Sequence, residues 1–237
     1  MRRHSGSYSL VVLIFTLVSL SAICVPNAQA SVVSVGSGAF GVGSTLTTFL
    51  GIPDGTEVNG LSVGGMLFSY SLGNGNVVTD GGPGVTNNIA PPNIVSIGNN
   101  AGILTVTLPG QVSLFGYGYA LLAATPITNA TSINLFQGVT PVGGLSYNGI
   151  PDNNFTGGFA GIASTIPFDR VQVTFNSVAA PAFAMDNIRT AQQSASVPEL
   201  SSMGLLIVAM VPLILFGYRR SVKEVERIHG KRKAFLT

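Results

Sequence analysis

Short runs of alternating apolar and polar residues fill the middle of the chain. Residues 171–175 read Val-Gln-Val-Thr-Phe, and residues 104–108 read Leu-Thr-Val-Thr-Leu. A period of two is typical of β-strands with one buried face. Turn signals rich in Gly, Pro, Asn and Asp separate these runs, at 53–55, 73–75, 80–83, 108–110 and 151–153. The pattern predicts an all-β ectodomain over 31–190: a single antiparallel β-sandwich, jelly-roll-like, with about ten to twelve strands.

A longer apolar run lies near the N-terminus. Arg2 and Arg3 precede the run Leu10–Leu20, and the small-x-small site formed by Ala28 and Ala30 follows it. A basic start, an apolar centre and a small-residue site are typical of a secretory signal peptide. An uncleaved anchor would need about 20 apolar residues. Residues 1–30 are therefore predicted to be a signal peptide that the Sec translocon uses and signal peptidase removes after Ala30.

A second apolar segment, residues 201–218, carries no charge and is followed by Arg219 and Arg220. At 1.5 Å per residue a helix of this length spans about 27 Å, close to the thickness of a hydrocarbon core. The basic residues of 219–237 favour a cytoplasmic tail. A buried core helix is the alternative, but it rarely has an apolar circumference beside a cationic flank. The segment is predicted to be a transmembrane helix, which places the ectodomain in the periplasm or outside the cell.

The residues before this helix, with the arginines after it, carry a resemblance to a known family. Residues 191–200 form a predicted linker. The candidate sorting motif consists of Val197, Pro198, Glu199 and Leu200 at the end of this linker, with Arg219 and Arg220 after the helix. It resembles the C-terminal sorting signal of PEP-CTERM proteins. These proteins are secreted by Gram-negative bacteria that make exopolysaccharide. The resemblance implies an exosortase-like membrane protease and exopolysaccharide as partners. Two features depart from the family pattern: Leu200 stands where Pro is usual, and the tail continues to Thr237. A permanent membrane anchor is the alternative.

Parts of the ectodomain are also similar to this family. Residues 48–68 resemble the first hairpin of PEP-CTERM ectodomains, and residues 159–188 resemble their closing strands. Those domains are similar to carbohydrate-binding jelly rolls. The resemblance implies a β-sandwich fold and a role in the exopolysaccharide or biofilm matrix.

The charges argue against a nucleic-acid partner. The chain has 11 Lys and Arg against 9 Asp and Glu, but Arg170 and Arg189 are the only cations of the predicted ectodomain. Six carboxylates lie in the same region, which gives it a formal net charge of −4. Phosphate binding needs clustered Lys and Arg.

Several kinds of catalysis are excluded by composition. The histidines are His4 and His229, and the single cysteine is Cys24; all three lie outside residues 31–190. The 60–64 segment has nucleophile-elbow spacing, but a Ser-His-Asp triad lacks its histidine there. Zinc sites built from His and Cys are excluded as well. The segment 36–41 matches a dinucleotide fingerprint, but β-branched residues follow where a helix is required. We expect a structural or matrix-associated protein with no enzymatic activity, cofactor or metal.

Three alternatives remain open. A carbohydrate-binding module could stack sugars on tyrosines, the candidates being Tyr70, Tyr117, Tyr119 and Tyr147, although such rings more often cover a sandwich. A glycan-active enzyme could use two of the six carboxylates. Asp186 with Asn187 could ligate Ca²⁺, or Asp186 could bond nearby backbone amides.

Overall fold

The computed structural model describes residues 31–96, 98, 100–152 and 154–192. The predicted signal peptide, its cleavage site at Ala28 and Ala30, the sorting motif and the transmembrane segment lie outside the described residues. Within the described part of the chain, no helix is both long enough and apolar enough to cross a membrane.

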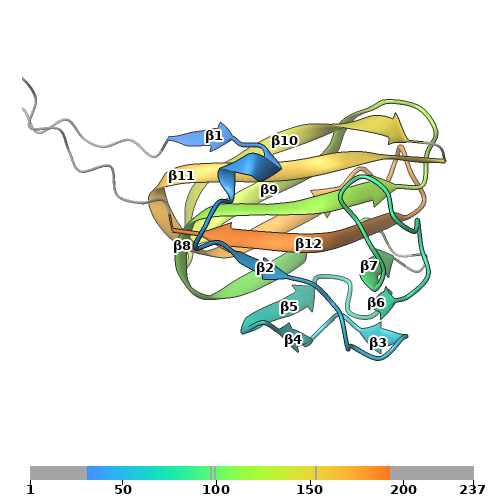
Figure 1. Ribbon diagram of the computed structural model, residues 1–237, viewed down its shortest axis with the longest axis horizontal. Coiled ribbons are helices and arrows are strands. Elements are labelled where there is room, and N and C mark those ends of the chain that lie inside the picture. Colours follow the sequence, from blue (N-terminus) through green and yellow to red (C-terminus); the bar gives the residue numbers. More distant parts are fainter. Residues whose placement is uncertain (1–30, 97, 99, 153, 193–237) are drawn as a thin grey trace, which may run out of the picture. The chain divides into compact units, whose positions relative to one another are not determined.

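These residues form one antiparallel sheet of twelve strands in the order β10-β9-β11-β8-β12-β7-β6-β3, with β1, β2, β4 and β5 paired beside this path (Figure 1). The strands are β1 Val32–Ser34, β2 Thr45–Thr47, β3 Thr56–Glu57, β4 Ser62–Val63, β5 Met66–Tyr70, β6 Asn76–Thr79, β7 Asn93–Ser96, β8 Leu104–Leu121, β9 Ile127–Gln137, β10 Thr140–Asp152, β11 Phe155–Phe175 and β12 Phe183–Ala191. A 3-10 helix, η1 (Ser37–Ala39), follows β1. The predicted all-β antiparallel architecture is confirmed.

The two longest strands, β8 and β11, pass through both halves of the sheet. In one half of the sheet the first part of β8 pairs with β5, and in the other half its second part pairs with β12. Strand β11 pairs with both parts of β8. The turn predicted at 108–110 is wrong, because these residues lie within β8. The β8–β11 register shifts beside them, between Ala163 and Arg170. Pro109, which has no N–H to donate, therefore sits next to an interruption of the ladder.

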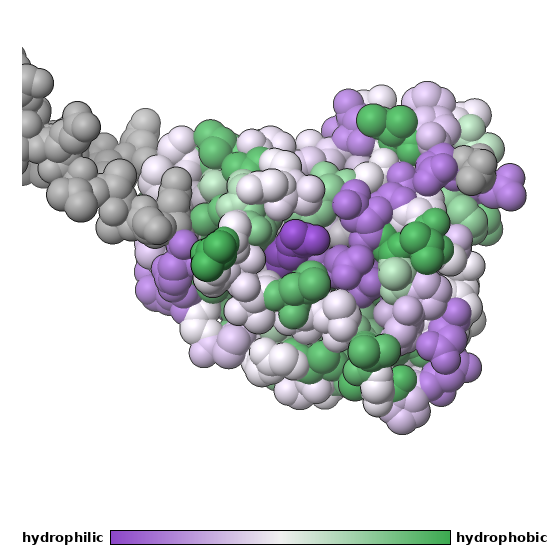
Figure 2. Space-filling view, viewed as in Figure 1, coloured by the Kyte–Doolittle hydropathy of each residue, from purple (hydrophilic) through white to green (hydrophobic). Residues whose placement is uncertain are grey.

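One main core lies between the two halves of the sheet. It combines the first part of β8, at Leu104 and Val106, with the second part, at Phe115 and Tyr117. The predicted alternation is confirmed in β11, where Val171 and Val173 are fully buried. The sheet therefore folds over itself around these side chains. Figure 2 shows hydrophobic residues in several separate groups on the viewed face, among polar ones.

The outer face of β8, β11 and β12 is covered by two irregular segments. A Cβ on Gly118 of β8 would lie 2.1 Å from the backbone O of Asn88. A Cβ on Gly161 of β11 would lie 2.4 Å from the backbone O of Val35. Glycine at these positions lets other parts of the chain approach the sheet more closely than any side chain would allow. As a result, the second half of β8 is buried on both of its faces.

Candidate functional site

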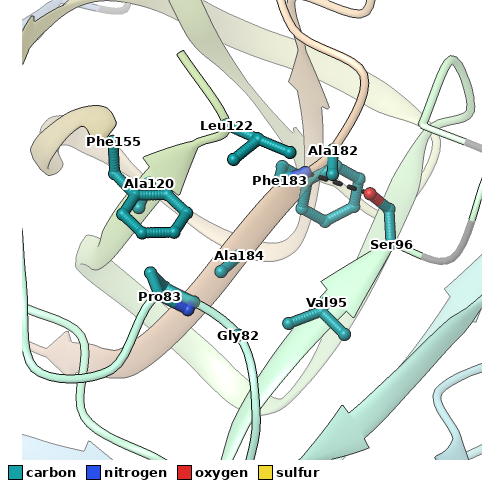
Figure 3. Close-up of a pocket in the computed structure, with 10 residues that line it drawn as sticks. All are labelled: Gly82, Pro83, Val95, Ser96, Ala120, Leu122, Phe155, Ala182, Phe183 and Ala184. Atoms are coloured by element: carbon teal, nitrogen blue, oxygen red, sulfur yellow. Dashed lines mark hydrogen bonds between the residues drawn. The ribbon is translucent and has the colours of Figure 1, made fainter. Parts of the chain in front are cut away.

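An open groove of about 270 Å³ lies on the outer face of the sheet, across β7, β12, β8 and the start of β11. Figure 3 shows Ala184 near its centre, with Phe155 and Pro83 on one side and Val95 on the other. The residues that line the groove are Gly82, Pro83, Val95, Ser96, Ala120, Leu122, Phe155, Ala182, Phe183 and Ala184.

The floor of the groove follows from strand register. Ala184 of β12 pairs with Ala120 of β8 on one side and with Val95 of β7 on the other. Their chain neighbours, Tyr119 and Met185, point into the main core, so the alanines face outward. Two adjacent methyl groups leave a hollow where larger side chains would fill the surface.

Larger side chains form the walls. Phe155 is the first residue of β11 and is partly exposed. Leu122 follows the end of β8 and is 47% exposed. Ser96 is buried, and its Oγ accepts a hydrogen bond from the Phe183 N–H at 3.0 Å. The lining contains no ionisable side chain. The groove therefore offers apolar surface, including one face of an aromatic ring.

The side chains of Asp152 and Thr86 form a hydrogen bond close to Phe155. Asp152, at the end of β10, is exposed and pairs in register with Phe155. Its Oδ2 accepts a hydrogen bond of 2.5 Å from the hydroxyl of Thr86. The register therefore places Asp152 beside Phe155, one of the residues that line the groove.

Asp186 lies beneath the loop that covers Gly118. It is 1% exposed, and its Oδ2 accepts a 3.2 Å hydrogen bond from the Ala90 N–H, while Oδ1 has no partner. Burial raises the pKa of Asp186 to about 6, and hydrogen bonds from the N–H groups of Asn187 and Ala90 act in the opposite direction. Among the described residues, no group of three or more His, Cys, Asp or Glu could hold a metal ion. The contacts seen for Asp186 are those of the backbone-amide alternative.

The tyrosines proposed for sugar stacking are not surface platforms. Tyr70, Tyr117 and Tyr119 are at most 4% exposed, and Tyr147, half-buried, donates its hydroxyl to the Gly161 carbonyl at 2.6 Å. Burial raises the pKa of Tyr117 well above its usual value and that of Tyr119 to about 12. The rings of Tyr117 and Tyr119 share a face of β8, but it is the core face, and Asn88 covers the glycine between them.

The remaining sequence motifs have structural roles. Ser62 of the elbow-like segment lies in the two-residue strand β4, and strand β5 follows it directly where a nucleophile elbow would have a helix. The fingerprint-like segment 36–41 contains the three-residue helix η1. Asp54 accepts a 3.1 Å hydrogen bond from the Asp80 N–H, and its pKa is lowered by hydrogen bonds from the Thr79 side chain and from that amide. Asp54 thus links its own turn to the backbone of a second turn at Asp80.

The groove residues were not identified from the sequence. Phe155, Pro83 and Leu122 come from distant parts of the chain and show no common spacing. The available signal was the outward-facing alanines at 120 and 184, which become neighbours only when β8 pairs with β12.

No family model matches this sequence, and a search of curated proteins also finds no match. Several solved structures are similar in part. A point mutant of the family 29 carbohydrate-binding module CBM29-2 has a TM-score of 0.34 and 10% identity, covering 62% of this chain and 90% of its own. Another family 29 module has a TM-score of 0.32 and 10% identity, covering 62% and 88%. The catalytic domain of a GH87 α-1,3-glucanase, in complex with tetrasaccharides, has a TM-score of 0.31 and 9% identity, covering 63% and 31%. Similarity at this level carries no argument about ligand or activity.

Proposed function

We propose that the chain is an exported cell-envelope protein whose jelly-roll-like β-domain is a non-catalytic carbohydrate-binding module. The groove is its binding site. The observation that carries the proposal is the partly exposed ring of Phe155 in an open groove, with the exposed carboxylate of Asp152 beside it. A sugar ring has an apolar C–H face and hydroxyl edges. The phenyl ring would pack against the face, and the carboxylate would accept hydrogen bonds from the hydroxyls.

The dimensions favour a short stretch of glycan. The volume of about 270 Å³ lies just below the range of about 300–1,000 Å³ typical of small-molecule pockets. A role in binding, as opposed to hydrolysis, is supported by the carboxylates. Most glycosidases place two of them on either side of the scissile bond. Here the groove lining has none, Asp152 pairs with Phe155 outside the lining, and Asp186 is 1% exposed.

Phe155→Ala is expected to weaken glycan binding by at least about tenfold, because the substitution removes the aromatic surface from the groove. The measurement is calorimetric titration of the full chain in detergent with gluco- and manno-oligosaccharides and with exopolysaccharide from the native host. Val178→Ala, at a 98% exposed position in the loop before β12, is the control and should bind like the wild type. Absence of binding by the wild-type chain, or equal binding by Phe155→Ala, contradicts the proposed function.

The location of the protein is part of the same proposal. We infer from the sequence that a signal peptide directs export, that residues 201–218 hold the chain in the inner membrane, and that an exosortase-like protease reads the motif around Pro198 and Glu199. Exopolysaccharide around the cell would then be the ligand available to the groove. This inference rests on residues outside the described part of the chain.

Glu199→Ala is expected to leave a full-length, membrane-bound protein in a host that contains the protease. The substitution removes the single negative charge of the motif and leaves the apolar segment and its arginines unchanged. Leu200→Pro, which restores the usual residue, should keep or improve processing because proline favours an extended backbone before the helix. Intact mass and cell fractionation measure both effects, with Glu224→Ala in the tail as control. Wild-type protein that retains Thr237 would show a permanent anchor instead.

A further inference from the structure

The floor of the groove continues beneath the loop formed by residues 86–90. Ile89 of this loop is 2% exposed and packs against Ala120 and Ala184, with Val95 and Phe155 at its sides. The same four residues line the groove. Ile89 therefore lies on the same floor as the open groove, and it covers the part of that floor that the groove does not.

The loop is shaped so that Ile89 points down onto the sheet. Thr86 and Ile89 exchange two backbone hydrogen bonds, of 2.7 and 3.1 Å, which close a tight turn. The two residues inside the turn, Asn87 and Asn88, have φ angles of 48° and 64°. Asparagine tolerates this left-handed conformation better than most residues.

Three side-chain contacts fix the turn to separate strands. Asp186 of β12 accepts the Ala90 N–H, and Asn187 donates from Nδ2 to the Asn88 carbonyl at 2.7 Å. On the other side, Thr86 donates to Asp152 at the end of β10. The loop is anchored at both ends and in its middle, so Ile89 is held in place as a fixed boundary.

We propose that Ile89 determines specificity by closing one end of the groove and so limiting the length of glycan that binds. This inference rests on the proposed function of the groove. The Ile89 side chain covers the part of the floor above Ala120 and Ala184 that the open groove does not, where the next sugar unit would lie. Shortening the side chain, while the anchored backbone stays in place, opens that space as a continuation of the groove.

The test compares wild type, Ile89→Val and Ile89→Ala, using the full chain in detergent and gluco- and manno-oligosaccharides of two to six units. Affinity for the shortest bound oligosaccharide should stay the same in all three. For longer ones, Ile89→Ala should gain roughly tenfold over wild type, since a few methyl groups in an apolar pocket discriminate by that order. Ile89→Val should fall between them. Circular dichroism and thermal unfolding confirm that each variant is folded.

The outcomes separate this inference from the function on which it rests. Binding that depends on Phe155 but has the same length dependence in wild type and Ile89→Ala overturns the role of Ile89 and leaves the proposed function intact. Equal weakening at every length shows that Ile89 only supports the fold, which also overturns the inference. If no oligosaccharide binds to the wild type or to Ile89→Ala, both proposals are wrong.

Discussion

Gly118→Ala is expected to destabilise the β-domain by roughly 3 kcal/mol, a large effect for one added methyl group. The new Cβ would lie 2.1 Å from the backbone O of Asn88 and 2.6 Å from its backbone C. Neither side can yield easily. Gly118 is paired with Phe159 of β11 and with Asp186 of β12, and the loop is anchored by its own hydrogen bonds.

Gly110→Ala is the matched control, because it lies in the same strand and its Cβ would meet nothing within 4 Å. We expect it to be neutral or slightly stabilising, since alanine reduces the freedom of the unfolded chain. Urea unfolding of the three proteins measures the difference. Equal midpoints for Gly118→Ala and Gly110→Ala would show that the loop does not rest on Gly118 in solution.

Asp186→Asn is expected to remove a pH dependence of stability between about pH 4 and pH 6. Burial raises the folded-state pKa of Asp186 from 3.8 to about 6, so the folded chain binds this proton more tightly than the unfolded chain does. The stability that the protonated carboxyl provides is complete below about pH 4 and is lost as the pH rises through about 6. A shift of about two pKa units corresponds to at most roughly 3 kcal/mol.

At neutral pH, the asparagine variant should therefore be more stable than the wild type. Its side-chain carbonyl can still accept the Ala90 N–H, so the loop keeps this anchor. The measurement is the urea midpoint from pH 4 to pH 8, in a chelating buffer. Asp80→Asn, at an exposed position, is the control and should follow the wild-type profile. The same loss of stability with pH in Asp186→Asn would assign the effect to another group.

Local patterns predicted the strands well where one face is buried against the core. Residues 171–175 and 104–108 show the expected alternation, because one face of each strand is buried in the core and the other face is less buried. The prediction was wrong where a third layer of chain covers the sheet. Tyr117 and Tyr119 were candidates for sugar stacking, but their rings face the core, and Gly118 between them is covered by a loop about thirty residues earlier in the sequence. No periodicity within β8 records that contact.

The groove could not be predicted for a related reason. Its floor depends on the pairing of Ala120 with Ala184. Its walls depend on the loop at residues 82–83 and on Phe155 at the start of β11, which are far apart in the sequence. Sequence spacing reports on neighbours along one strand. Small residues that face outward on two strands are informative only after the strand order is known.

The pairing of the first strands with the last ones has a consequence for the timing of folding. β1 pairs with β11 and β2 pairs with β12, so more than a hundred residues separate each strand from its partner. Any process that delivers the chain from its N-terminus onwards, such as synthesis or translocation, leaves β1 and β2 unpaired until residues 155–191 arrive. A sheet of such non-local contacts forms slowly. During that interval the unpaired strand edges are exposed to other chains, which makes this intermediate prone to aggregation.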